Sequence, residues 1–312
     1  MYYYIGYSKE SELRYKASSG GVGSAIIKYL LSTGEYGTSM TFVFCKNEYK
    51  YVPKLIYNFS DYNNCGSVYQ DINVISFIRD NISNIKNGIV VTCMPCQVKA
   101  IRSILAKNGV KYFIISLCCS GQTTIEGTWY YYKLLGISKE DVKCIQYRGN
   151  GWPSGIQIEL YNGDIIKRNN YSYPWTIIYQ SLLFRPKRCL NCTEKTSNAA
   201  DISLADPWLK EFMENDSKGN SVVICNDDGN SLIKEMEENE LLTVTEVDEN
   251  KYIESQLGTI QYKRESIKNK RFNRLVGKMG IDGSFYKRIM TSSVLFLKIH
   301  IRLLGILKKV LH

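Results

Sequence analysis

The 312-residue chain is 44% hydrophobic and carries a formal net charge of +10. This length is enough for a sizeable core and two subdomains, and the composition excludes collagenous, coiled-coil and broadly disordered proteins. Residues 261–312 hold thirteen Lys or Arg and two acidic residues, a net charge of +11, so the rest of the chain sums to −1. A basic tail on a nearly neutral body argues against a nucleic-acid-binding protein, which needs basic residues across a folded face.

The first 142 residues show the alternation of strands and helices that is typical of a parallel sheet with crossover helices. A Ser/Gly-rich loop leads into the first helix, which Ser18 or Ser19 is expected to cap and which Gly34 ends. The later elements are expected as strand, helix, strand, helix, strand and helix over 41–46, 72–86, 88–91, 98–108, 111–117 and 125–135.

From about residue 143 the pattern changes to short strands joined by tight turns. Residues 143–169 alternate in the manner of strands, and Asn162-Gly163 predicts a hairpin. We therefore expect a mixed α/β fold in three parts. These are a largely parallel sheet with crossover helices (1–142), a smaller α+β subdomain (143–260) and a basic tail with an amphipathic helix (261–312).

The cysteines are the strongest chemical signal. Ten occur in a chain whose start, MYYYIGYSKESELRY, does not resemble a secretory signal, so we expect a cytoplasmic protein whose thiols serve metal, cluster or redox chemistry. The only histidines, His300 and His312, lie in the last thirteen residues. Any metal site in the body must therefore use Cys, Asp or Glu, and Ser-His or Cys-His hydrolases are disfavoured.

Two CxxC pairs, CMPC at 93–96 and CLNC at 189–192, indicate a thiolate-bound centre. CMPC follows one predicted strand, and the pair at 118–119 follows the next. In a parallel sheet both loops emerge at the same edge, where the ligand sites of such sheets form. Cys93 or Cys96 should therefore lie beside Cys118 or Cys119, with CLNC arriving from the second subdomain.

Three kinds of thiol site compete. A thioredoxin-like dithiol fits CMPC at the start of a helix but leaves CLNC unexplained. A four-thiolate zinc site usually has its CxxC pairs close in sequence, whereas 92 residues separate Cys96 from Cys189. An iron–sulfur cluster tolerates scattered ligands and is favoured here. Four other cysteines are expected to be small buried hydrophobes: Cys45, Cys65, Cys144 and Cys225.

Other segments could bind a ligand. The stretch ASSGGVGSA opens a helix with free N–H groups, which suits a phosphate or pyrophosphate, although an ordinary helix cap is an equal interpretation. Arg148 and Trp152 lie in one Gly-rich loop, and Asp206 and Trp208 follow a short predicted strand. An aromatic ring with a nearby charge could orient a planar ligand, but loop packing more often explains such residues.

The C-terminal segment 292–312 predicts a mostly apolar helix with one narrow polar stripe. Charges inside the apolar run argue against a membrane-spanning helix. The stripe fits a helix that lies on an anionic membrane surface or docks on a partner, and packing on the body of the protein is equally open. The stripe consists of Lys298, Arg302, Gly305, Lys309 and His312.

Taken in order, the motifs resemble the coenzyme F420 hydrogenase/dehydrogenase beta-subunit family, whose members are flavin- and iron–sulfur-containing oxidoreductases. The family's ferredoxin-like cysteine-rich segment has no counterpart here, and Ser120 and Ala205 stand where the family has His and Gly. The resemblance covers about residues 13–208. It rests on SSGGVGSAI (18–26), CGSVYQ (65–70), TCMPCQVKAI (92–101), LCCSG (117–121), YRGNGW (147–152), CLNC (189–192) and DISLAD (201–206).

The resemblance implies two cofactors. A [4Fe–4S] cluster would be held by Cys96, Cys119, Cys189 and Cys192. An FAD would have its pyrophosphate held by Ser18, Ser19, Gly20, Gly21 and Gly23. The flavin site would be lined by Gly66, Ser67 and Thr92. Arg148, Trp152 and Asp206, which could orient a planar ligand, are expected to contact the flavin as well.

The function implied is an oxidoreductase that exchanges electrons or hydride between two partners. One is a small carrier or substrate of deazaflavin or nicotinamide type, and the other is an electron-transfer protein. Bacterial members occur among surface-polysaccharide genes, where a basic tail suits work at the inner membrane face. The alternative is a zinc-stabilised or degenerate accessory protein of polysaccharide assembly, docked at the membrane through 292–312.

Overall fold

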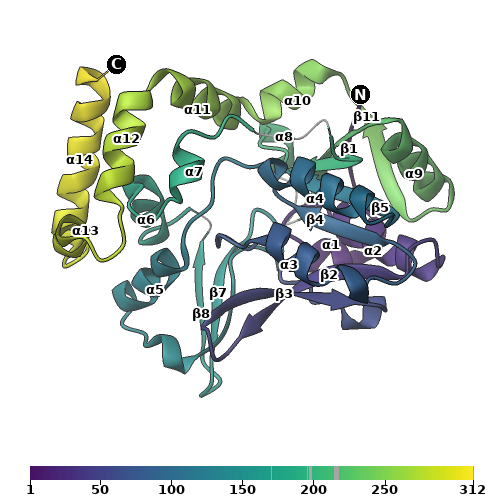
Figure 1. Ribbon diagram of the computed structural model, residues 1–312, viewed down its shortest axis with the longest axis horizontal. Coiled ribbons are helices and arrows are strands. Elements are labelled where there is room, and N and C mark those ends of the chain that lie inside the picture. The colour runs from purple at the N-terminus through teal and green to yellow at the C-terminus, as the bar shows by residue number, and fades with distance from the viewer. Residues whose placement is uncertain (170, 195, 197–198, 214–217, 312) are drawn as a thin grey trace.

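The computed structural model of the protein describes residues 1–169, 171–194, 196, 199–213 and 218–311. Its main feature is an eight-stranded sheet, covered by helices and flanked at one end by the C-terminal helices (Figure 1). The strands of this sheet are β1 (Tyr2–Ser8), β2 (Thr38–Cys45), β3 (Lys50–Ile56), β4 (Ile89–Cys93), β5 (Tyr112–Leu117), β9 (Ile202–Ala205), β10 (Ser221–Cys225) and β11 (Leu242–Glu246).

The order across the sheet is β11-β1-β10-β9-β5-β4-β2-β3. The central strands β2, β4, β5 and β9 run parallel to one another, and antiparallel pairs extend the sheet on both sides. Cys93 of β4 pairs with Ser116 of β5, which pairs with Ser203 of β9. The loops after these three strands therefore leave the sheet at one edge. The predicted mixed α/β fold is confirmed.

Helices cover both faces because the strands alternate apolar side chains between the faces. Val90 of β4 faces α2 (Val22–Ser32) and α9 (Asp227–Glu238), whereas Ile89 and Val91 face α3 (Val74–Asp80) and α4 (Pro95–Lys107). The remaining helices are α1 (Ser11–Lys16), α5 (Ile125–Leu134), α6 (Trp175–Ser181), α7 (Lys187–Leu190), α8 (Lys210–Met213), α10 (Glu249–Ser255), α11 (Leu257–Lys268), α12 (Lys270–Met279), α13 (Phe285–Met290) and α14 (Val294–Val310).

A second, antiparallel sheet comprises β6 (Val142–Gln146), β7 (Gly155–Leu160) and β8 (Ile165–Asn169). The turn between β7 and β8 lies at the predicted hairpin. Strands β9–β11 join the large sheet instead, so that sheet is continuous across the predicted boundary at residue 142. The boundaries at 142 and 260 stay predictions.

Two local expectations are wrong. The helix after the Ser/Gly-rich loop is capped by Gly21, not by Ser18 or Ser19, because Gly21 adopts a left-handed conformation (φ 77°) and the serine hydroxyls bond elsewhere. The helix expected over 72–86 is the short α3 followed by a single 3₁₀ turn at 82–84.

Helix α14 packs on the body through one face. Leu297, His300 and Leu304 are buried, and the His300 ring contacts the Tyr286 hydroxyl (2.8 Å) and the carbonyl of Ser181 (2.9 Å). His312 lies outside the described residues. Within the part of the chain that the structure describes, no helix has the length and apolarity needed to span a membrane.

Candidate functional site

A cavity of about 380 Å³ lies where the loops after β4, β5 and β9 leave the sheet. These loops supply Cys93–Cys96, Cys118–Gly121 and Asp206 to its wall. Residues from the loop before α2, from 62–72, from α7 and from α11 close the other sides. This is the position at which open α/β sheets bind ligands, because the ends of parallel strands leave a crevice there.

All four predicted cluster thiols line this one cavity. Cys96 lies in the first turn of α4, Cys119 follows β5, Cys189 belongs to α7 and Cys192 follows it. Burial and then the charges of Cys192, Cys119 and Cys189 raise the pKa of Cys96 to about 11. Three distant segments therefore bring four thiols within electrostatic reach of one another.

The thiols do not form a ready-made single-ion site. Among the described residues, no three Cys, His, Asp or Glu side chains are placed to hold one metal ion. Tetrahedral zinc with Zn–S bonds of ~2.3 Å needs its sulfurs about 3.8 Å apart. A four-iron core is wider than one ion, so its thiolates stand further apart than zinc ligands.

Two buried cations lie beside the thiols. Lys263 of α11 is 3% exposed, lines the cavity and makes no hydrogen bond or ion pair within the described chain. Burial raises the pKa of Cys119, and the Lys263 charge opposes that rise. Arg185 is 7% exposed, and its Nη1 donates to the carbonyl of Ser120 at 3.0 Å. Such cations favour a negatively charged group held by thiolates.

Gly121 makes room for the second cation. A Cβ at this position would lie 1.6 Å from Nη1 of Arg185, and the φ of Gly121 is 134°. Any side chain here would displace the guanidinium from its place above the Tyr179 ring, 4.4 Å from the ring centroid. The glycine of the LCCSG motif therefore has a steric role in this site.

The opposite part of the cavity is suited to an anion. Gly21, Gly23 and Ser24 at the start of α2 line it, and no side chain caps this helix. The first N–H groups of a helix carry the positive end of its dipole, so they attract phosphate. Ser18 and Ser19 also line the wall, where the Ser67 hydroxyl donates to Oγ of Ser18 at 2.8 Å.

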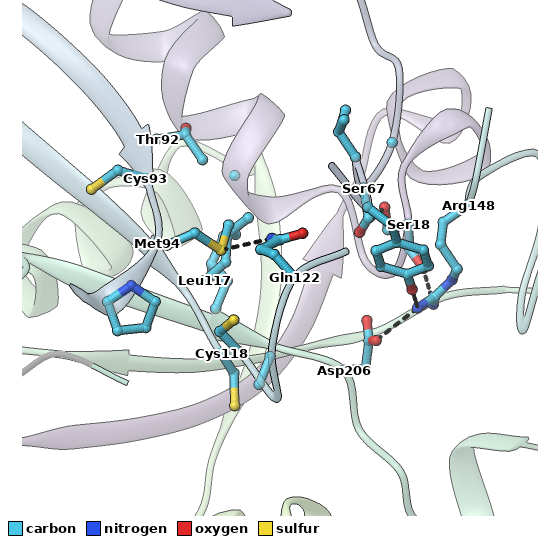
Figure 2. Close-up of a pocket in the computed structure, with 18 of the residues that line it drawn as sticks. Ser18, Ser67, Thr92, Cys93, Met94, Leu117, Cys118, Gln122, Arg148 and Asp206 are labelled. Atoms are coloured by element: carbon cyan, nitrogen blue, oxygen red, sulfur yellow. Dashed lines mark hydrogen bonds and ion pairs between the residues drawn. The ribbon is translucent and has the colours of Figure 1, made fainter. Parts of the chain in front are cut away.

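An ion pair fixes the loops on this side (Figure 2). Arg148 is 1% exposed, and its guanidinium donates to Asp206 (2.9 Å), the Ser18 carbonyl (2.7 Å) and Oγ of Ser154 (3.0 Å). Burial, the largest single effect, would lower the pKa of Arg148, but Asp206 and the Tyr69 hydroxyl together outweigh burial and raise the pKa. Both residues line the cavity, and their main visible role is to hold the Ser18 loop.

The other predicted contacts divide into two groups. Gly66 and Thr92 line the cavity, and Gly66 lies so close to Arg148 that a Cβ would be 2.0 Å from its carbonyl oxygen. Gly20 and Trp152 do not line it. Gly20 donates its N–H to Ser221 at the base of the loop (3.0 Å), and the buried Trp152 indole donates to the Phe212 carbonyl (2.7 Å).

Two polar atoms in the cavity wall lack partners in the described chain, Nδ2 of Asn64 and Oε1 of Gln122. Figure 2 shows Gln122 beside Met94, to whose sulfur its amide donates at 3.1 Å. A donor and an acceptor left without partners suit the polar edge of a heterocycle. Sequence patterns missed both residues, as they missed Lys263 and Arg185, because none belongs to a recognisable motif.

The chain is similar to solved structures. A chain of the F420-reducing [NiFe] hydrogenase complex from Methanosarcina barkeri, studied by xenon derivatisation, is similar with a TM-score of 0.64 at 16% identity. The match covers 87% of this chain and 93% of that one, and it shows the fold. No curated protein matches the chain.

Two family models match successive parts of the sequence. Both describe the beta subunit of "Coenzyme F420 hydrogenase/dehydrogenase": the model of its N-terminal part matches residues 3–79, and the model of its C-terminal part matches residues 86–250. Together these ranges include every motif on which the resemblance rests. The chain therefore belongs to the coenzyme F420 hydrogenase/dehydrogenase beta-subunit family.

Proposed function

We propose that the protein is a flavin- and [4Fe–4S]-dependent oxidoreductase. Family membership indicates a redox role. The observation that carries the finer proposal is that one cavity is lined both by seven cysteines, the four predicted cluster ligands among them, and by a Gly-rich helix start that has no side-chain cap. Thiolates are the usual ligands of iron–sulfur clusters, and such a helix start binds pyrophosphate.

Cys96, Cys119, Cys189 and Cys192 would hold the cluster. Lys263 and Arg185 would balance its negative charge, since both are buried and their charges act on Cys119 and Cys189 respectively. Among the described residues no three Cys, His, Asp or Glu side chains converge on one ion, so the chain offers no preformed zinc site. Cys93 is the last residue of β4 and packs in the hydrophobic cluster between β4 and α4, so it fits the role of a packed neighbour better than that of a ligand.

Ser18, Ser19, Gly21 and Gly23 would hold the pyrophosphate of FAD at the start of α2. Gly66, Ser67 and Thr92 would line the flavin, and the unpaired atoms of Asn64 and Gln122 would meet its polar edges. The Arg148–Asp206 pair would position the phosphate loop, Gly20 would anchor its base, and Trp152 would support the Arg148 guanidinium, which lies 5.3 Å from its ring centroid. When bound, the flavin exchanges hydride and the cluster exchanges single electrons; the protein places the cofactors and tunes their potentials.

The hydride partner would be a small carrier or substrate of deazaflavin or nicotinamide type, and the single-electron partner a protein. The similar solved chain belongs to an F420-reducing complex, which supports a deazaflavin carrier. A role in surface-polysaccharide assembly and a cytoplasmic location stay predictions.

Anaerobic purification tests the proposal directly. We expect a brown protein with about four iron and four sulfide per chain and one FAD released on denaturation. Iron, sulfide and flavin are measured on the same preparation. Colourless protein that contains one zinc per chain and no flavin would refute the proposal and support the accessory-protein alternative.

The outer face of α14 favours peripheral contact with an anionic membrane as an accompanying property. Six apolar side chains on α14 stay exposed while the opposite face packs on the body, and Lys298, Arg302 and Lys309 flank them. The six are Leu295 (66%), Phe296 (41%), Ile299 (39%), Leu303 (43%), Ile306 (58%) and Val310 (74%).

Vesicle sedimentation tests this contact. The double variant Leu303→Glu, Ile306→Glu should be released from phosphatidylserine vesicles. In the wild type both apolar side chains would enter the boundary between headgroups and acyl chains, where a carboxylate is unfavourable. Ile165→Glu, on an exposed strand residue of the second sheet, is the matched control. Equal binding by all three proteins would show that α14 does not face the membrane.

A further inference from the structure

A second groove, of about 470 Å³, lies between α7 and α12. It shares no lining residue with the 380 Å³ cavity at the ends of β4, β5 and β9, which we call the cofactor cavity. Four of its eight lining residues are cations, and none is acidic. We call the exposed residues Lys187, Lys270, Arg274 and Lys278 the basic face. No ion pair neutralises any of these four side chains within the described part of the chain, so their charge is available to a partner.

The spacing of these residues makes a continuous surface. Lys270, Arg274 and Lys278 are four residues apart on α12, so they form one row of about 12 Å along the helix. Lys187 joins the row from the first position of α7. Helix α12 lies beside α14 at one end of the molecule, far from α9 (Figure 1).

The basic face is attached to the loop that carries two of the candidate cluster ligands. Leu190 and Asn191 lie between Cys189 and Cys192. The Ser266 hydroxyl of α11 donates to the Leu190 carbonyl, and the Asn273 amide of α12 donates to Oδ1 of Asn191 at 3.2 Å. The same loop therefore contacts the cofactor cavity with its thiols and α12 with its intervening residues.

Close packing brings the cations near this loop. A Cβ at Gly277 would lie 3.5 Å from Cδ1 of Leu190, so α12 approaches α7 at that point. Phe272 and Val276 are buried in one cluster with Leu190. With these residues turned inward, the row of Lys270, Arg274 and Lys278 is left on the outer side of α12.

We infer that the basic face docks an acidic one-electron carrier protein beside the CLNC loop. The inference rests on the proposed function, because it names the partner of the proposed cluster. Charge complementarity commits the surface to an acidic partner, and electron-transfer encounters use small interfaces below about 1,200 Å², which a row of this length can anchor. A second copy of this chain is disfavoured, because a two-fold contact would bring two cationic rows together.

Binding of an acidic plant-type [2Fe–2S] ferredoxin tests the inference. The triple variant Lys270→Glu, Arg274→Glu and Lys278→Glu should bind it at least tenfold more weakly than wild type at about 50 mM salt. The difference should vanish near 1 M salt, where the screening length falls to about 3 Å. The matched control reverses three exposed, unpaired lysines elsewhere: Lys54→Glu, Lys107→Glu and Lys234→Glu.

The control has the same change in net charge, so it should weaken binding less than twofold. Equal weakening of both triple variants would mean that only net charge matters and would overturn the inference, as would unchanged binding of the α12 variant. Loss of binding to phosphatidylserine vesicles with ferredoxin binding intact would assign the face to a membrane and also overturn it. If the triple variant misfolds, the milder variant Arg274→Gln tests the same surface and should still weaken ferredoxin binding measurably.

The test separates this inference from the proposed function. Iron content is measured on each protein, because reversing exposed charges on α12 should leave the thiols and any cluster intact. A wild type that contains no iron but binds ferredoxin through α12 would refute the cluster and keep the docking surface. A protein with full iron content and no α12-dependent binding would refute the docking surface alone.

Discussion

Removing the Asp206 carboxylate should destabilise the protein by more than any exposed ion pair could explain. Arg148 is 1% exposed and Asp206 is 21% exposed, so Asp206→Ala leaves a nearly buried guanidinium without its counter-ion. Breaking a fully buried pair costs about 3–5 kcal/mol. Because Asp206 is partly exposed and Arg148 keeps its bonds to Ser18 and Ser154, we expect about 2–3 kcal/mol.

Urea unfolding of the unloaded protein measures this loss of free energy of unfolding. Asp80→Ala is the control, because Asp80 pairs with Arg79 and both side chains are more than 60% exposed. An exposed pair is worth about 0–1 kcal/mol, so the control should lose less than 1 kcal/mol. Asp206→Asn should fall between the two, since its amide oxygen still accepts a hydrogen bond.

The same variant connects stability to the cofactor. The Arg148 guanidinium donates to the Ser18 carbonyl, so a misplaced guanidinium frees the loop before α2. Asp206→Ala should therefore retain less flavin than wild type at equal protein concentration. If Asp206→Ala and Asp80→Ala lose the same free energy of unfolding, the structural role given to this pair is wrong.

Three further outcomes are expected. Cys96→Ser and Cys189→Ser should each lose most of the iron, as measured by metal analysis. Cys225→Ser, which lies in the core away from the cavity, should keep its iron, and equal loss from all three variants would exclude the ligand set. Lys263→Met should lower the reduction potential of the proposed cluster by roughly tens of millivolts in a spectroscopic titration, because removing a nearby positive charge disfavours the reduced, more negative state. An unchanged potential would contradict the role given to Lys263. Burial lowers the pKa of His300 below 6.5. The stability that the neutral ring contributes is therefore present above pH 6.5 and is lost as the pH falls through the folded-state pKa. The free energy of unfolding should decrease less steeply on acidification in His300→Gln than in wild type, and identical slopes would refute this.

The sequence could predict the two thiol-bearing loops of the sheet because their positions follow from local pattern. Each cysteine loop follows an apolar strand, and parallel strands end at one edge. The pairing of Cys93 with Ser116 shows that the two loops leave the sheet side by side. The side-by-side placement of the loops that carry Cys96 and Cys119 therefore follows from the sequence pattern alone.

The remaining features depend on contacts between distant segments. Strand β1 pairs with β10 and β11, more than 200 residues away, and no local pattern encodes that pairing. Arg185 and Lys263 reach the thiols only because α6, α7 and α11 fold over the cavity. Trp152 looked like a ligand contact from its Gly-rich loop, but it packs against Trp208 with ring centroids 5.4 Å apart.

The placement of the CLNC loop explains why its two cysteines come from so far along the chain. In the proposed ligand set the loops after β4 and β5 supply Cys96 and Cys119, and the body contains no histidine that could serve as a further ligand. The CLNC segment, which also lines this cavity, would supply the other two thiols. Because Leu190 and Asn191 are held by α11 and α12, a partner bound to α12 would lie next to the same loop that holds Cys189 and Cys192. Ligand supply and partner contact would then be two functions of one short segment.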